Sequence, residues 1–358
     1  MAEAGPSLGD LIDMEIRASG PMSMATYMAL CLSHPSRGYY RKADPLGAAG
    51  DFITAPEISQ TFGEMIGGWM ADLYVQMGSP TSLVVFEPGP GRGTLMADAL
   101  RVATRVPGFG AALQLRLFES NADLAAMQAE RLAEYNPIAV SEPEDIPEGP
   151  VIVVANEFFD ALPIRQFVRR GAKWFERCVG LEDGRRCFGL SPTPYDPDLL
   201  GPAFADAAEG AVAEIGLAAE KFMARLGRVV APRGGAILAI DYGYGRTQPG
   251  ETLQALARHA HADPLAEPGA ADLTAHVDFE TLGRAARMAG LTVAPLVEQG
   301  RFLTSLGLAE RHAALARANP DKAEALAEAF ARLTHPAQMG KLFKAFCAAS
   351  PGLRPAGF

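Results

Sequence analysis

The sequence predicts an α/β protein with a Rossmann-like fold, in which helices cover a mostly parallel sheet. Apolar runs at residues 83–87, 151–155 and 236–240 have the length of buried strands. Stretches with helical spacing of apolar residues, such as 95–106, lie between them. Strands that alternate with helices are typical of βαβ units in a parallel sheet.

The elements follow in order along the chain. Residues 7–32 have a helical pattern that breaks at Gly20 and Pro21, and a Gly/Pro-rich stretch then predicts irregular structure over 38–56. Further helices are expected over 57–77 and 121–135. Leu113, Leu115 and Leu117 alternate and predict a second strand after the run at 83–87.

Two insertions interrupt this order. Residues 164–190 predict antiparallel strands with a turn at Asp183–Gly184, and Ala-rich residues 198–227 predict helix. The second insertion is rich in His, Asp and Pro, and the tail over 305–349 is expected to be helical. The predicted division is an N-terminal helical cap and Gly-rich loop (1–80), a core (81–300) with insertions at about 161–227 and 251–277, and a C-terminal strand and helical tail (301–358).

The charge composition limits the classes of partner that the protein can bind. The chain of 358 residues has 32 basic and 42 acidic residues and a formal net charge of −10. This balance argues against a general nucleic-acid binder and suits a cationic ligand or a basic partner segment. The apolar runs are far shorter than the roughly 20 residues that span a bilayer, so no membrane insertion is expected.

The N-terminus and the four cysteines predict a location in the cytoplasm of a bacterium. Residues 1–13 show neither a secretory signal nor an Arg-rich transit peptide. No cysteine pair has the short spacing of a zinc or redox site, so buried thiols in a reducing compartment are expected. A Cys178–Cys187 bridge is the alternative and requires an oxidising location.

A glycine-rich turn is the central feature of the sequence. Glu87-Pro88-Gly89-Pro90-Gly91-Arg92-Gly93 follows a predicted strand and opens a predicted helix. Glycines at such a turn allow a tight bend and let a ligand approach the backbone.

Three interpretations of this loop are open: a dinucleotide site, an S-adenosylmethionine site and a turn without ligand. The dinucleotide fingerprint requires a third glycine at position 94, which is Thr94, and Glu87 would lie close to an anionic pyrophosphate. S-adenosylmethionine has no phosphate and carries a sulfonium and an ammonium group, which suit an acidic residue beside the loop. The third interpretation is a tight turn without ligand.

Acidic residues follow two more strands. Glu119, with Ser120 beside it, ends the second strand, where a carboxylate can accept hydrogen bonds from ribose hydroxyls in either ligand. Asn156, Glu157, Phe158, Phe159 and Asp160 follow the strand at 151–155. The carboxyl ends of parallel strands are where ligands bind in open α/β sheets.

The loop at 156–160 predicts a site for a methyl acceptor. Glu157 and Asp160 can hold a guanidinium through charge-assisted hydrogen bonds and orient the attacking nitrogen, with Asn156 beside them. Orientation is the more plausible role because arginine is not readily deprotonated in proteins. The rings of Phe158 and Phe159 can exclude water and stack on the planar group.

These residues resemble the MidA family of methyltransferases. The resemblance spans nearly the whole chain, and its motifs lie at residues 34–40, 50–63, 87–93, 156–163, 241–243, 272–279 and 339–344. The family includes a mitochondrial assembly factor that methylates an arginine on a subunit of respiratory complex I. The resemblance implies a class I methyltransferase fold with a mostly parallel seven-stranded sheet, an N-terminal helical cap and an inserted substrate-side region.

The resemblance also implies further site residues. It places S-adenosylmethionine on the glycine loop, S-adenosylhomocysteine as its product, no metal, and a protein substrate such as a complex I subunit. Asp145 is expected at the adenine amino group, and His276 and Asp278 at the acceptor, although Asp278 suits a helix cap equally well. The residues expected to fold over the donor are Gly50, Asp51, Phe52 and Thr54.

Three functions therefore follow from the sequence. The first is methylation of a protein arginine, with a role in complex I assembly. The second is a nicotinamide-dependent oxidoreductase, which the glycine spacing and Glu87 disfavour. The third is a docking or assembly protein that keeps a donor pocket without catalysis. A homodimer is compatible with each of them.

Overall fold

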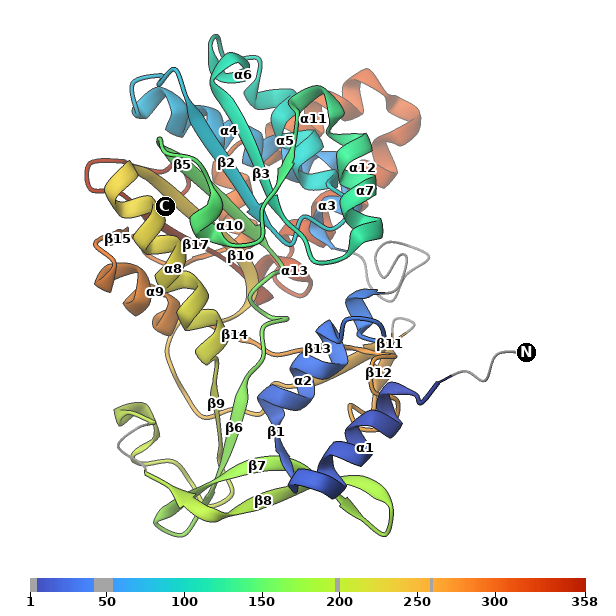
Figure 1. Ribbon diagram of the computed structural model, residues 1–358. Helices are drawn as coiled ribbons and strands as arrows, with labels where there is room; N and C mark the ends of the chain where they lie inside the picture. Colours follow the sequence, from blue (N-terminus) through green and yellow to red (C-terminus); the bar gives the residue numbers. More distant parts are fainter. Residues whose placement is uncertain (1–4, 42–53, 197–199, 258–259) are drawn as a thin grey trace. The chain divides into compact units, whose positions relative to one another are not determined.

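The computed structural model describes residues 5–41, 54–196, 200–257 and 260–358. Contacts between residues divide the chain into two compact units (Figure 1). The first consists of residues 1–52, 160–220 and 246–278, and the second of residues 53–159, 221–245 and 279–358.

The second unit contains the central sheet. Its seven ordered strands run β15-β17-β10-β5-β2-β3-β4. Neighbouring strands from β10 to β4 are parallel, whereas β17 is antiparallel to β10 and to β15. The class I methyltransferase fold with a mostly parallel seven-stranded sheet is thus confirmed. The strands are β2 (Leu83–Pro88), β3 (Leu113–Phe118), β4 (Ile138–Ala139), β5 (Val151–Asn156), β10 (Gly235–Tyr244), β15 (Thr292–Val293) and β17 (Phe343–Ala349), with β16 (Val297–Glu298) paired to β17.

Strand order explains where the ligand site lies in this unit. The chain leaves β2 toward β3 and β4 and then returns to β5 on the opposite side of β2. The connections after β2 and β5 therefore diverge at the carboxyl ends of these strands. Such a topological switch point is where open α/β sheets bind ligands.

Helices cover this sheet and close its core. They are α3 (Ala55–Ile58), α4 (Gln60–Gln76), α5 (Thr94–Ala103), α6 (Phe109–Ala112), α7 (Ala122–Arg131), α8 (Leu217–Arg233), α9 (Phe279–Met288), α10 (Gln299–Ser305), α11 (Leu308–Ala318), α12 (Ala323–Thr334) and α13 (Met339–Leu342). Short 3₁₀ turns lie at Ala133–Tyr135, Pro143–Asp145 and Pro320–Lys322.

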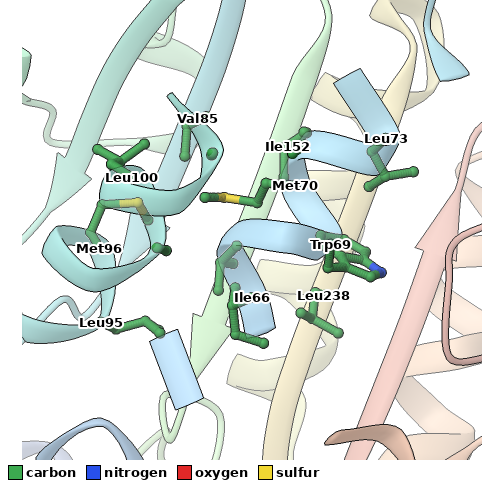
Figure 2. Packing of buried hydrophobic residues seen from close by; sticks show 14 of the residues in the cluster. Ile66, Trp69, Met70, Leu73, Val85, Leu95, Met96, Leu100, Ile152 and Leu238 are labelled. Atoms are coloured by element: carbon green, nitrogen blue, oxygen red, sulfur yellow. The ribbon is translucent and has the colours of Figure 1, made fainter. Parts of the chain in front are cut away.

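The core beneath α4 and α5 is the largest buried cluster (Figure 2). Trp69 and Met70 of α4 pack over Ile152 and Leu238, which point from β5 and β10 to the same face. These side chains are at most 1% exposed. Such close packing holds α4 against the sheet.

The first unit contains two smaller sheets and its own core. One sheet has the order β1-β7-β6-β9, with β8 on β7, and the other has the order β12-β11-β13. Its elements are α1 (Leu8–Ser19), β1 (Met22–Ser23), α2 (Met24–Ser33), β6 (Arg165–Arg170), β7 (Lys173–Glu182), β8 (Arg185–Tyr195), β9 (Val212–Ile215), β11 (Gln254–Ala257), β12 (Ala260–Ala262), β13 (Asp272–Thr274) and β14 (Val277–Asp278), with 3₁₀ turns at Tyr39–Arg41 and Pro202–Phe204.

Most of the predicted elements are confirmed, and two were wrong. Residues 212–215 of the stretch predicted as helix form β9, which pairs with β6, so the helix begins only at Leu217. The last seven residues of the predicted helical tail form β17, which lies between β10 and β15 in the central sheet. The predicted turn is confirmed, with left-handed backbone at Asp183 and Gly184.

Two further findings concern the whole described chain. None of its helices combines the length and the apolar character needed to cross a membrane. All four cysteines are free thiols, so the alternative Cys178–Cys187 bridge is not formed.

Candidate active site

The glycine loop between β2 and α5 has a backbone that requires glycine. Gly89, Gly91 and Gly93 have φ values of +64°, +54° and +73°, in the left-handed region that side chains disfavour. A Cβ atom at Gly89 would lie 2.9 Å from Cδ2 of Phe158. Side chains at these three positions would strain the backbone, and one at Gly89 would also clash with Phe158.

Glu87 lies beneath this loop at the end of β2. It is 2% exposed, and its Oε2 atom has no hydrogen-bond partner within the described chain. Burial raises the pKa of the Glu87 carboxyl to about 8. A buried carboxyl without a cationic partner suits an ammonium or sulfonium group and opposes a pyrophosphate, so the residues present fit S-adenosylmethionine.

Glu119 follows β3 and is linked to the glycine loop. Its Oε1 atom accepts a hydrogen bond from the Asn121 amide at 2.8 Å, and its Oε2 atom accepts one from Nε2 of Gln128 at 3.4 Å. The same Gln128 amide donates to the carbonyl of Gly91 at 2.6 Å. Ser120 is exposed. Gln128 was not predicted as a site residue, and the signal for it is a polar side chain four positions after Leu124, on the buried face of α7.

Glu157 follows β5 in a constrained conformation. Its φ is +50°, which is rare for a residue with a side chain and concentrates at functional sites. Its Oε1 atom accepts hydrogen bonds from the Ala55 amide at 3.0 Å and from Nδ2 of Asn156 at 3.1 Å. These two hydrogen bonds hold the carboxylate in one orientation.

An aromatic cluster lies beside this carboxylate. The ring centroid of Phe158 is 4.8 Å from that of Phe222 on α8, 5.4 Å from Phe159 and 6.4 Å from Phe118. The Phe159 amide donates to Oδ2 of Asp241 at 3.0 Å, and Asp241 is fully buried at the end of β10. No role was predicted for Phe222 or for Asp241, although Asp241 opens the motif at 241–243.

Asp160, His276 and Asp278 belong to the first unit. Asp160 is 6% exposed, and its carbonyl accepts a hydrogen bond from the Ala275 amide at 3.0 Å. The His276 amide donates to Oγ1 of Thr252 at 2.9 Å, and Asp278 accepts from Oγ1 of Thr247 at 2.6 Å. The chain at 275–276 is therefore held beside Asp160.

The remaining predicted residues have simpler surroundings. Asp145 is exposed, and its Oδ2 atom accepts a hydrogen bond from the Glu142 amide at 3.0 Å. Thr54 is half-buried and directly precedes α3. Gly50, Asp51 and Phe52 lie outside the described residues. No group of three His, Cys, Asp or Glu side chains that could hold a metal ion occurs in the described ranges.

Comparisons with known proteins identify the cofactor as S-adenosylmethionine. A family model described as "Putative S-adenosyl-L-methionine-dependent methyltransferase" matches residues 65–297. A crystal structure from Burkholderia thailandensis, bound to S-adenosyl-homocysteine, has a TM-score of 0.87 and 29% identity, covering 98% of this chain and 93% of that chain. With the fold and the glycine loop, these findings define an S-adenosylmethionine-dependent methyltransferase.

Similarity to curated proteins identifies the family to which the chain belongs. The chain is 35% identical to the mitochondrial "Protein arginine methyltransferase NDUFAF7 homolog" of Drosophila melanogaster, over 98% of this chain and 87% of the relative. It is 32% identical to the mitochondrial "Protein arginine methyltransferase NDUFAF7" of Homo sapiens, over 93% of this chain and 81% of the relative. The chain belongs to the MidA family of methyltransferases.

Proposed function

We propose that this methyltransferase methylates an arginine of a protein and that a subunit of respiratory complex I is its substrate. The observation that carries the proposal is the carboxylate of Glu157, which two donors hold at the carboxyl end of β5. A fixed carboxylate at this edge suits a cationic, planar acceptor. The curated relatives, which are named protein arginine methyltransferases, support the same acceptor.

Donor binding is assigned to the residues around the glycine loop. The donor lies against the backbone at Gly89, Gly91 and Gly93. The Glu87 carboxylate compensates the positive charge of its ammonium and sulfonium groups. Glu119 accepts hydrogen bonds from the ribose, with Ser120 beside it. The bound donor supplies an electrophilic methyl group. The further donor contacts that we propose are at Asp145, Thr54, Gly50, Asp51 and Phe52.

Acceptor binding is assigned to the loop after β5. Glu157, with Asn156 as its hydrogen-bond partner, holds the guanidinium so that one nitrogen faces the methyl group, and Asp160 compensates the positive charge. The cluster around Phe158 and Phe159 excludes water, which strengthens these charge interactions. His276 and Asp278 are proposed to contact the substrate beyond the guanidinium.

The test is transfer of a radiolabelled methyl group to purified complex I subunits, followed by mass spectrometry of the labelled peptide. We expect methylarginine with the wild-type protein and at least about 100-fold less with Glu157→Gln. Glu148→Gln is the matched control, because Glu148 lies at the surface in an ion pair with Arg233. Label on another residue type, or full transfer by Glu157→Gln, would contradict the arginine mechanism.

The docking alternative predicts a different result. A docking protein would support complex I assembly without transferring a methyl group. Gly91→Val, which blocks the donor loop, would then leave assembly unchanged in cells that lack the wild-type gene. We expect loss of assembly while the variant still binds its partner.

The setting of the reaction is also a proposal. Four free thiols suit the reducing cytoplasm of a bacterium, and the net charge of −10 suits a protein partner rather than nucleic acid. We also propose that the protein forms a homodimer, and light scattering of the purified protein tests this oligomeric state directly.

A further inference from the structure

Helix α3 contacts the glycine loop through one acidic side chain, Glu57. The Glu57 Oε1 atom accepts a hydrogen bond from Oγ1 of Thr94 at 2.6 Å, and its Oε2 atom lies 3.6 Å from a guanidinium nitrogen of Arg92. The side chains of Glu57 and Arg92 are only 21% and 18% exposed. Because Arg92 and Thr94 flank Gly93, Glu57 holds the last part of the loop from both sides.

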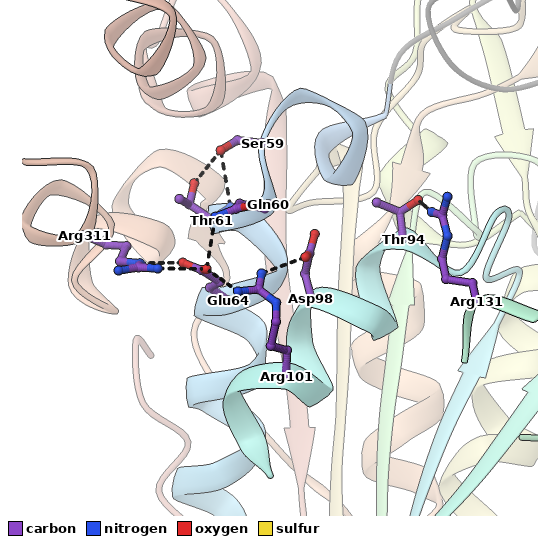
Figure 3. Close-up of polar contacts among 9 residues, drawn as sticks. All are labelled: Ser59, Gln60, Thr61, Glu64, Thr94, Asp98, Arg101, Arg131 and Arg311. Atoms are coloured by element: carbon purple, nitrogen blue, oxygen red, sulfur yellow. Dashed lines mark hydrogen bonds and ion pairs between the residues drawn. The ribbon is translucent and has the colours of Figure 1, made fainter. Parts of the chain in front are cut away.

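Thr94, the hydrogen-bond partner of Glu57, is also held from its other side. Thr94 is the first residue of α5, and its hydroxyl receives a hydrogen bond from Arg131 at the end of α7 (Figure 3). The Thr94 hydroxyl therefore donates to Glu57 and accepts from Arg131. One hydroxyl thus joins α3, α5 and α7 at the point where the loop becomes a helix.

The same short helix contacts the proposed catalytic carboxylate. The amide of Ala55, two residues before Glu57, donates to Oε1 of Glu157 at 3.0 Å. The four residues of α3 consequently join the donor loop after β2 to the acceptor loop after β5. A shift of α3 would move both groups together.

Helix α3 is itself held by a rigid neighbour. Ser59 separates it from α4 and caps that helix through the Thr61 amide. One turn further, the carboxylate of Glu64, which is 3% exposed, binds Arg101 of α5 at 3.2 Å and Arg311 of α11 at 2.6 Å (Figure 3). The helix after α3 is therefore fixed by ion pairs on its polar side and by the core on its apolar side.

We propose that Glu57 is a positioning residue that holds the glycine loop in its donor-binding conformation and in register with Glu157. The inference rests on the proposed donor placement at the glycine loop. Three left-handed glycines make this loop flexible when it is not restrained. A hydrogen bond that orders the loop before binding lowers the entropy lost on binding and raises donor affinity.

The experiment is a double-mutant cycle on the affinity for S-adenosylhomocysteine, measured by calorimetry on the full chain. Glu57→Ala and Thr94→Val each remove one side of the hydrogen bond, and we expect each to weaken binding about 3- to 10-fold. The double variant is expected to weaken binding by less than the product of the two single effects, because both changes remove the same hydrogen bond while each also removes a second contact, with Arg92 or with Arg131. Glu57→Gln keeps an accepting oxygen and is expected to bind within about 2-fold of wild type.

Turnover gives a second readout that a purely structural role would not change. At saturating donor, Glu57→Ala is expected to lower kcat about 3- to 10-fold, since α3 also orients Glu157. Glu176→Ala is the matched control. Its carboxylate forms a bidentate pair with Arg165 at 2.7 Å with a similar exposure of 17%, and it lies in the other unit. This control is expected to keep both donor affinity and kcat.

The outcomes separate the inference from the function on which it rests. Wild-type affinity in Glu57→Ala and Thr94→Val, or effects that multiply in the double variant, would overturn the positioning role. Retained binding in Gly91→Val would instead overturn the proposed donor placement, and the inference with it. Should Glu57→Ala fail to fold, Thr94→Val decides alone, because valine keeps the shape of threonine while its hydroxyl is lost.

Discussion

Donor binding is expected to release a proton from Glu87. The carboxyl is fully buried, burial raises its pKa to about 8, and its Oε2 atom has no partner among the described residues. At pH 7 about 0.9 of the free protein would therefore hold this proton. The ammonium group of a bound donor favours the ionised form, so binding at pH 7 should release about 0.9 proton and at pH 9 about 0.1.

The assay is calorimetric titration with S-adenosylhomocysteine in phosphate and in Tris, whose ionisation enthalpies differ. The slope of the binding enthalpy against the buffer enthalpy gives the number of protons released. Between pH 6 and pH 8 the donor Kd should fall about tenfold per pH unit and then level off. Glu87→Gln, which cannot ionise, should release no proton and show a flat pH dependence.

The same carboxyl predicts how stability depends on pH. Its pKa is raised in the folded state, so between pH 4.5 and pH 8 the folded protein holds a proton that the unfolded chain has lost. The free energy of unfolding therefore falls as the pH rises through this window, by about 5 kcal/mol in total. Glu87→Gln should remove that loss and melt at a higher temperature than wild type at pH 9. In the calorimetric assay, equal proton release by wild type and Glu87→Gln would show that the released proton does not come from Glu87.

Three further predictions concern the loops at the sheet edge. Glu157→Gln should lower kcat at least about 100-fold in single-turnover assays and keep donor affinity within about 2-fold, since it loses charge but not shape; a parallel loss of affinity would count against it. Gly89→Ala places a Cβ atom 2.9 Å from Phe158 at a φ of +64° and should weaken donor binding more than tenfold. Gly171→Ala is the control, because Gly171 has a similar φ of +59° and nothing within 4 Å, and it should only lower the melting temperature slightly. Phe222→Ala removes a ring packed against Phe158 and should lower the free energy of unfolding by about 3–4 kcal/mol, measured by urea denaturation; a loss below about 1 kcal/mol would show that the cluster does not support the fold.

Local patterns predicted the elements whose environment is uniform along the chain. Residues 83–86 and 151–155 are apolar without alternation, because both faces of a central parallel strand are buried. Helices α1 and α2 carry their own start signals, with Ser7 and Ser23 as caps and Gly20 at the break between them. Such elements can be recognised without knowledge of their partners.

Patterns failed where the partner decides the conformation. Residues 343–349 contain three alanines and follow a helical stretch, yet they form a strand because β10 and β15 on either side satisfy their backbone groups. Residues 212–215 are too short for any periodicity, and their pairing with β6 determines that they form a strand. In both segments tertiary contacts outweigh the small differences in local propensity.

The sequence by itself determined the fold class, the glycine loop and the types of residue at its edge, because each depends on local spacing or on the chemistry of single side chains. The tertiary structure decided which of them act together. It brings Gln128, Phe222 and Asp241 to the loops, and it joins Ala55 to Glu157 across 102 positions of the chain. Hydrogen bonds between residues so far apart arise only when the sheet aligns the ends of its strands, and no local pattern encodes that alignment.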